Sequence, residues 1–257
     1  MGTCFPLSDI DRVLGSSTST QLSCLFDTSF LVAASDKDHI FYDDASFFAE
    51  KLEEWDIAPF VSITARSEFI DYRRRVIITE TLMDMLGPKS KWKAPQAILK
   101  ELGSQKGWID NQPRIGREPI LSDSRIKHCK QLFLPRTQSG HVGWVELCKE
   151  VLDGKLLDYW ERISNALSLN YIDMRLSDTK DLFDTELRWE NMYQLAEQTA
   201  LGSHDSMILN MFGASKIKFL ITMDFDLAYG AMASLPDNKI VFVHDNLYRN
   251  RLKKLRF

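Results

Sequence analysis

The chain has 257 residues, of which 44% are hydrophobic and 26% are charged. These proportions are those of an ordinary globular protein, and they exclude a disordered or fibrous one. The length allows one elaborated domain or two small ones. The net charge of −4 gives no overall signature of nucleic-acid binding, although a local basic stripe on an acidic protein can still hold phosphates.

The cysteines and the N-terminal residues predict the compartment. The four cysteines form no CxxC pair, and Asp9, Asp11 and Arg12 interrupt any apolar run that could act as a secretory leader. No segment approaches the roughly 20 apolar residues that cross a bilayer. We therefore expect a soluble, cytoplasmic protein with reduced cysteines and no membrane partner.

Strands and helices alternate over the N-terminal third of the chain. The polar run at residues 15–20 is typical of a flexible lead-in, and a first strand is predicted at residues 22–26, ending at Asp27. A second strand is predicted at residues 59–62, and a long helix from Ile63 to about Met85. This order of elements favours a parallel sheet with crossover connections.

The pattern changes over residues 87–201. The segment 89–93 is basic with a tryptophan between the lysines, and the prolines and glycines that follow indicate loops. Helical patterns return at residues 144–167 and 182–201. We expect residues 87–201 to form a mainly helical insertion or cap, and residues 1–86 and 202–257 to form one α/β core.

The last part of the chain returns to the α/β pattern. A short helix is predicted to start at Ser203 or Asp205, a strand runs from Phe219 towards Asp224, and a last strand is predicted at residues 240–243. The C-terminal residues 249–257 are strongly basic. Such a run is typical of contact with nucleic acid, contact with an acidic partner, or a frayed end.

Four acids stand out because they follow predicted strands or lie near the start of helices. They are Asp27, Glu68, Asp205 and Asp224. In an open α/β sheet, ligands bind at the carboxyl ends of the strands. Convergent carboxylates raise one another's pKa and oppose joint ionisation unless a cation is present, and oxygen ligands suit Mg²⁺ or Mn²⁺. The set therefore predicts a site for a divalent metal.

Each of these acids also has an ordinary structural interpretation. Asp27 could cap a turn after its strand, Asp205 could be a helix N-cap, and Asp226 could be an acid at the start of a helix. Glu68 could lie on a solvated helix face. His204, beside Asp205, could contact a phosphate, but the sequence favours a surface or capping histidine. These interpretations explain the residues one at a time, but they do not explain the shared order of the acids.

With these motifs in place, the sequence resembles the PIN-domain nucleases, in particular the toxin ribonucleases of bacterial toxin–antitoxin pairs. The resemblance is carried by residues 25–32, 62–69, 204–209 and 220–227. It implies an α/β fold, a PIN-like domain with a central parallel sheet flanked by helices, to which the mainly helical insertion is added. The span between Glu68 and Asp205 is longer than in a minimal PIN domain.

The resemblance also implies a metal-dependent endoribonuclease that uses Mg²⁺ or Mn²⁺. Its catalytic and metal-binding acids would be Asp27, Glu68, Asp205 and Asp224. Asp226 would be an auxiliary metal ligand, while Thr28, Ser29 and Thr222 would orient carboxylates or water. The metal would lower the pKa of a bound water that attacks phosphorus, so no protein nucleophile is required.

The expected partners follow from this activity. They are an RNA substrate and an inhibitory antitoxin-like protein, and a homodimer is open as well. The aromatic residues of the long helices, Trp144, Trp160 and Trp189, could be core, dimer contact or antitoxin groove, and their pattern favours core. Candidate nucleic-acid contacts are Arg73, Arg74, Lys91, Trp92 and Lys93. Two other functions stay open on the same residues: a DNA- or structure-specific nuclease in phage defence, and a non-catalytic PIN-like module that binds proteins.

Overall fold

The computed structural model of this chain describes residues 2–16, 22–112, 118–172 and 180–255. The chain forms two compact units. Residues 1–69 and 162–257 make up the first, which we call the sheet unit, and residues 70–161 make up the second, which we call the helical unit. The boundaries between them fall inside helices α4 (Ile63–Asp84) and α8 (Lys155–Ala166).

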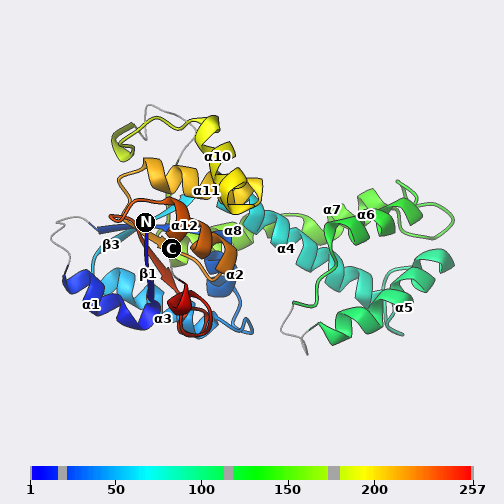
Figure 1. Ribbon diagram of the computed structural model, residues 1–257. Helices are drawn as coiled ribbons and strands as arrows, with labels where there is room; N and C mark the ends of the chain where they lie inside the picture. Colours follow the sequence, from blue (N-terminus) through cyan, green and yellow to red (C-terminus); the bar gives the residue numbers. More distant parts are fainter. Residues whose placement is uncertain (1, 17–21, 113–117, 173–179, 256–257) are drawn as a thin grey trace. The chain divides into compact units, whose positions relative to one another are not determined.

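A parallel sheet forms the centre of the sheet unit. Within the described residues it has six strands in the order β1-β6-β5-β2-β3-β4 (Figure 1). The strands are β1 (Thr3–Pro6), β2 (Leu22–Phe26), β3 (Ile57–Ser62), β4 (Asn170–Ile172), β5 (Phe219–Ile221) and β6 (Ile240–Val243). Each pairing is parallel, which confirms the predicted α/β class with a central parallel sheet.

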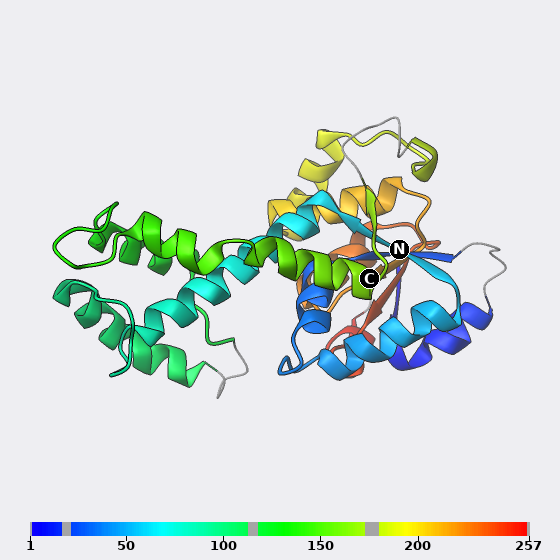
Figure 2. The ribbon, with the colours of Figure 1, turned by 180° about the vertical axis from the view of Figure 1, so that it is seen from behind.

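The connections between strands place helices on both faces of the sheet. Helices α1 (Ile10–Gly15) and α3 (Tyr42–Glu54) belong to connections that run towards β4. The connections that run the other way contain α10 (Trp189–Thr199), α11 (Ser203–Ala214) and α12 (Phe225–Ser234). Parallel crossovers are right-handed, so the two groups cover opposite faces. Figures 1 and 2 show α1 and α3 on one side and α10 and α11 on the other.

The direction of the connections reverses between β2 and β5. Strand β2 leads to β3 on one side, whereas β5 leads to β6 on the other side. These two strands are hydrogen-bonded neighbours, with Cys24, Leu25 and Phe26 opposite Phe219, Leu220 and Ile221. The carboxyl ends of β2 and β5 therefore form the topological switch point, which is where open α/β sheets bind ligands.

An aromatic cluster anchors this part of the sheet. Phe26, the last residue of β2, stacks on Phe30 of α2 (Thr28–Ser35) with ring centroids 4.2 Å apart. Phe48 of α3 meets both rings edge-on, at 6.1 and 5.7 Å. All three side chains are fully buried. Tightly packed apolar side chains thus support the backbone that carries Asp27.

The helical unit has a core of its own. It contains parts of α4 and α8 together with α5 (Gln96–Asn111), α6 (Asp123–Leu132) and α7 (Trp144–Leu152). Ile78, Ile98 and Leu147 are fully buried in one apolar cluster. The predicted helix over residues 144–167 is divided, because Gly154 between α7 and α8 has a φ of 71° that helical residues do not adopt.

The structure divides the chain at other residues than the sequence predicts. The helical unit covers residues 70–161, whereas the prediction is 87–201. Residues 162–201 belong to the sheet unit because β4 extends the sheet, with Asn170 opposite Phe60. No strand is predicted before residue 22, whereas β1 pairs along its length with β6. Residues 17–20 of the predicted lead-in lie outside the described residues.

Two segments in the second half of the chain differ from their predictions. The helix predicted over residues 182–201 is shorter, because α10 covers only Trp189–Thr199. In the basic C-terminal segment, α13 (Asp245–Asn250) and the 3₁₀ helix η4 (Leu252–Lys254) follow β6, and Leu252 is 1% exposed. A frayed end is therefore wrong for residues 249–255. In the described part of the chain, every helix is too short or too polar to traverse a bilayer.

Candidate active site

Asp27 lies at the carboxyl end of β2 and is held by four donors. Its side chain caps α2, where Oδ1 accepts from the Thr28 amide at 2.5 Å and Oδ2 from the Ser29 amide at 3.3 Å. The hydroxyls of Ser29 and Thr222 also donate to Oδ2, at 2.6 and 2.8 Å. Three of the four donors thus reach Oδ2, and Oδ1 keeps a lone pair for a cation.

The surroundings of Asp27 act on its pKa in two directions. The residue is 3% exposed, and its burial raises the pKa of the carboxyl group above its usual range. The hydrogen bonds from Ser29 and Thr222 oppose that rise, because they favour the charged form. The capping interpretation is confirmed for Asp27, and the cap leaves the carboxylate at the sheet edge.

Asp224 lies beside Asp27, at the end of β5. It caps α12, and its Oδ1 accepts from the amides of Asp226 and Leu227 at 2.6 and 3.1 Å. Thr222 links the two acids, since its hydroxyl donates to Asp27 and accepts from the Asp224 amide at 2.9 Å. Both cap bonds of Asp224 use Oδ1, so its Oδ2 is not engaged in the cap. The residue is also exposed to solvent.

Glu68 reaches the same edge from α4. Its Oε2 accepts from the Thr28 hydroxyl at 2.8 Å, and its Oε1 lies 3.0 Å from Nδ1 of His204. The Glu68 side chain is 28% exposed. The interpretation of Glu68 as a solvated face residue is therefore wrong, because both of its oxygens engage groups at the sheet edge.

Asp205 lies in the first turn of α11, opposite the strand ends. The N-cap of α11 is Gly202, so Asp205 is not the cap. Burial, together with the negative charges of the neighbouring acids, raises the pKa of Asp205 from its ordinary value of 3.8 to about 7. Those acids are Asp27, Asp224, Glu68 and Asp226. The five carboxylates therefore share one electrostatic environment, which we call the carboxylate cluster.

Asp226 and His204 complete the surroundings of the carboxylate cluster. Asp226 is exposed in the first turn of α12, so its interpretation as a helix-start acid is confirmed, and its charge also acts on Asp205. His204 is 64% exposed but contacts Glu68. From its position next to Asp205, sequence reasoning weighs a phosphate contact for His204 but favours a surface or capping role, and it does not predict the contact with Glu68.

The predicted nucleic-acid residues lie in the helical unit. Arg73 is 4% exposed, and its guanidinium packs over the rings of Tyr72 and Tyr159 at 5.5 and 4.9 Å. Its predicted contact with nucleic acid is wrong, because a buried side chain cannot reach a phosphate. Arg74 forms ion pairs with Asp71 and Asp123 at 2.6 and 2.8 Å, which neutralise its charge.

The basic segment around Trp92 is partly engaged as well. Lys91 pairs with Glu150 at 2.7 Å and lies 4.6 Å above the Trp92 ring. Trp92 is half-buried against the core of the helical unit, which leaves less of its ring for stacking on a base. Lys93 is exposed, and its carbonyl accepts from the Val142 amide at 2.9 Å. Contact of Lys91, Trp92 and Lys93 with nucleic acid stays a prediction.

The donor set of the carboxylate cluster fits a hard divalent cation. All its candidate ligands are carboxylate oxygens, the type that Mg²⁺ and Mn²⁺ prefer. Besides burial, repulsion by the neighbouring acids raises the pKa of Asp205, and a bound cation would offset that repulsion. As the side chains stand, no three His, Cys, Asp or Glu residues in the described ranges form a ready-made metal cage.

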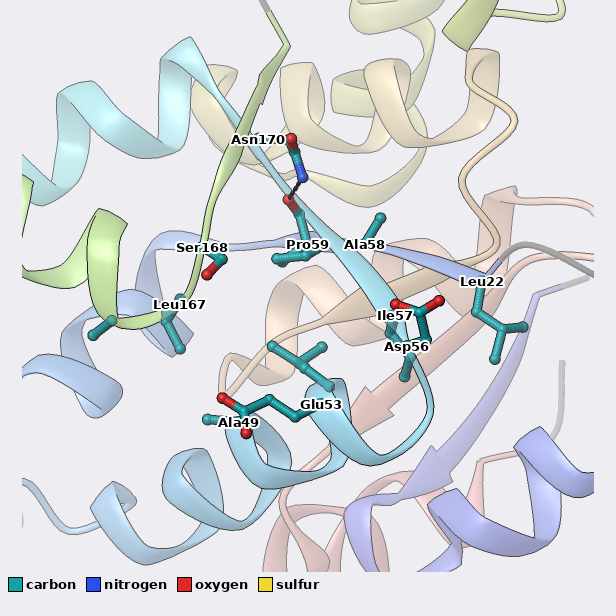
Figure 3. Close-up of a pocket in the computed structure, with 12 residues that line it drawn as sticks. Leu22, Ala49, Glu53, Asp56, Ile57, Ala58, Pro59, Leu167, Ser168 and Asn170 are labelled. Atoms are coloured by element: carbon teal, nitrogen blue, oxygen red, sulfur yellow. Dashed lines mark hydrogen bonds between the residues drawn. The ribbon is translucent and has the colours of Figure 1, made fainter.

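A pocket of about 360 Å³ lies at the other end of the sheet unit's strands. Figure 3 shows Leu22, Ile57 and Asn170 around it; these are the first residues of β2, β3 and β4. The Asn170 amide donates to the Pro59 carbonyl at 3.1 Å. The carboxylate cluster lies at the carboxyl ends of the strands, so this pocket is a separate feature.

Asp205→Asn is expected to stabilise the metal-free protein more at about pH 8 than at about pH 4. The folded protein keeps a proton on Asp205 up to about pH 7, whereas the unfolded chain releases it near 3.8. Stability therefore falls as pH rises through that window, and an amide removes this loss. Melting temperatures measured in chelator at both pH values test the prediction.

The control for this pH experiment is Glu197→Gln, which removes one charge from an exposed position on α10. Its effect on the melting temperature is expected to be small at both pH values, as for surface substitutions in general. An Asp205→Asn effect of equal size at both pH values would contradict the raised pKa.

Comparison with known proteins finds no relative of this chain. No family model, no curated protein and no solved structure matches the chain. The functional interpretation is therefore built on the residues and contacts described above.

Proposed function

We propose that this protein is a divalent-metal-dependent endoribonuclease, a PIN-like enzyme of the kind found in bacterial toxin–antitoxin pairs. One observation supports the proposal most. Asp27, Glu68, Asp205 and Asp224 gather at the carboxyl ends of the switch-point strands, where burial and the negative charges of the neighbouring acids together raise the pKa of Asp205 to about 7. Open α/β sheets bind ligands at this edge, and clustered carboxylates call for a cation.

The residues of the carboxylate cluster divide into ligands and supports. Mg²⁺ or Mn²⁺ would be held by the four acids, with Asp226 as an auxiliary ligand. When bound, the cation supplies Lewis-acid activation of water and offsets charge on the phosphate. Ser29 and Thr222 fix Asp27 through their hydroxyls, and Thr28 fixes Glu68. Supports of this kind keep ligands oriented before the cation arrives.

Purified protein is expected to cut a mixed-sequence single-stranded RNA in the presence of Mg²⁺ or Mn²⁺ and to leave it intact in chelator. The assay separates the fragments on a gel and includes DNA of the same sequence. Cleavage of RNA alone indicates that the 2′-hydroxyl is required. Cleavage of DNA alone would replace the ribonuclease with a DNA nuclease on the same scaffold.

A second measurement distinguishes a metal site that lacks its natural substrate in the assay from a protein that has no metal site. Divalent metal is expected to raise the melting temperature of the protein, because a ligand that binds only the folded state stabilises it. If neither polymer is cut and metal leaves the melting temperature unchanged, the nuclease proposal is wrong and the non-catalytic PIN-like module takes its place.

A protein inhibitor and a cytoplasmic location belong to this proposal. Trp189 and Tyr193 lie one turn apart on α10 and are 60% and 56% exposed, with ring centroids 6.4 Å apart. Aromatic side chains are enriched at protein interfaces, so this pair supports an antitoxin-like partner or a second copy of the chain. The sequence pattern favours Trp189 as a core residue, and that interpretation is wrong.

A further inference from the structure

The basic C-terminal segment is held against the sheet unit. Leu247 of α13 and Leu252 of η4 are 7% and 1% exposed, so they fix the segment by apolar contacts. Arg249 pairs with Asp245 at 3.0 Å. Arg251, in contrast, places its guanidinium 4.9 Å from the centre of the Phe225 ring. The segment thus presents a positive charge at the start of α12.

Helix α12 carries two aromatic rings on its outer face. Its buried residues are Leu227, Ala228, Gly230 and Ala231. Phe225 and Tyr229 lie on the opposite face, one helical turn apart, with ring centroids 6.0 Å apart and planes at 36°. Tyr229 is 36% exposed. We call Phe225, Tyr229 and Arg251 the aromatic platform.

The aromatic platform begins at the carboxylate cluster. Phe225 directly follows Asp224 in the chain, and Asp226 follows Phe225. Tyr229 lies about 6 Å further along the helix axis, since α-helices rise 1.5 Å per residue. A nucleic-acid strand that places a phosphate at Asp224 therefore has aromatic rings within reach of its neighbouring base.

Charge also favours a nucleic-acid strand at the aromatic platform. The carboxylate cluster repels phosphates, so a substrate strand needs cations beside it. Arg251 brings a guanidinium to the residue next to Asp224, and Lys253 and Lys254 of the same segment are exposed. Aromatic rings with nearby cations are the combination by which proteins bind single strands without reading their sequence.

We propose that the aromatic platform is a subsite for single-stranded nucleic acid, in which a base flanking the phosphate at the carboxylate cluster stacks on Tyr229 and Phe225 while Arg251 neutralises an adjacent phosphate. The proposal rests on the proposed nuclease function for the reaction at that phosphate. Binding of the strand itself requires neither metal nor cleavage, so the two can be tested apart.

The test measures binding of a fluorescent single-stranded RNA of about 12 nucleotides by anisotropy, in chelator so that no cleavage occurs. Tyr229→Ala is expected to weaken binding by about ten-fold, within the range for loss of one stacking ring. Tyr229→Phe keeps the ring and is expected to bind within about two-fold of wild type. Alanine favours helices, and circular dichroism checks that α12 is retained.

A matched control and a salt titration give the test its specificity. Tyr193→Ala removes a tyrosine of α10 that is 56% exposed, more than the 36% of Tyr229, and is expected to leave binding unchanged. Arg251→Gln is expected to reduce the slope of log affinity against log salt by about 0.7, the value for one phosphate contact on a single strand. Unlabelled polyglutamate is expected not to compete.

The outcomes separate this proposal from the nuclease proposal. If Tyr229→Ala binds like wild type, or if polyglutamate competes regardless of Tyr229, the aromatic platform is wrong even when the wild type cuts RNA with metal. If the wild type binds no single strand, the platform is wrong as well. If Tyr229→Ala weakens binding while the wild type cuts no nucleic acid and metal leaves its melting temperature unchanged, the platform stands and the nuclease proposal fails.

Discussion

An Asp224→Asn variant is expected to lose more than about 100-fold in metal-dependent RNA cleavage and to fold like the wild type. Substitution of a residue that only supports a metal ligand costs less, about 10–100-fold. Asparagine caps helices as well as aspartate does. Its amide oxygen can replace Oδ1 as acceptor for the Asp226 and Leu227 amides. Only the charge is removed. Initial rates with Mg²⁺ or Mn²⁺ and a melting curve measure the two effects.

The choice of Asp224 over Asp27 matters for this test. An amide nitrogen in place of Oδ2 of Asp27 would face the Ser29 N–H, so Asp27→Asn is expected to reduce both cleavage and stability. Glu197→Gln removes an exposed charge on α10 and is expected to keep the wild-type rate. Wild-type cleavage by Asp224→Asn would remove Asp224 from the catalytic set.

A Phe30→Ala variant is expected to lose about 3–5 kcal/mol of the free energy of unfolding. The Phe30 ring is fully buried, stacks on Phe26 at 4.2 Å and meets Phe48 edge-on at 5.7 Å. Alanine would leave a cavity directly beneath the backbone that carries Asp27. Urea unfolding measures the loss as a lower midpoint with an unchanged slope.

Phe47→Ala is the matched control for Phe30→Ala. Phe47 precedes Phe48 on α3 but is 38% exposed. Its replacement by alanine is therefore expected to lower the free energy of unfolding by about 1 kcal/mol or less. Equal losses for the two variants would show that the aromatic cluster does not stabilise the sheet unit as its packing indicates.

The strands of the sheet's centre can be predicted from the sequence, whereas its edges cannot. Strands β2 and β6 have the predicted bounds, because each is a run of apolar residues that leads into a polar one. The edge strand β1 has four residues, and the edge strand β4 has three. A period of two cannot be recognised over so few positions, so only pairing with β6 and β3 identifies them.

The positions of the site acids follow from the sequence, but their contacts do not. Strand ends place Asp27 and Asp224 at one edge, since parallel strands share their direction. The hydrogen bond from the Thr28 hydroxyl to Glu68 depends on where α4 passes the sheet. The burial of Arg73 likewise depends on Tyr159, which lies 86 positions further along the chain and has no local signal.

The bridge from Thr222 to Asp27 has a consequence during synthesis of the chain. The two residues are 195 positions apart, so a ribosome working at about 5–20 residues per second needs about 10–40 s to travel between them. Asp27 emerges first, and the carboxylate cluster cannot close until β5 has emerged and paired with β2. On the proposed nuclease function, the nascent chain therefore cannot cleave the messenger RNA that encodes it before the codons of β5 have been read.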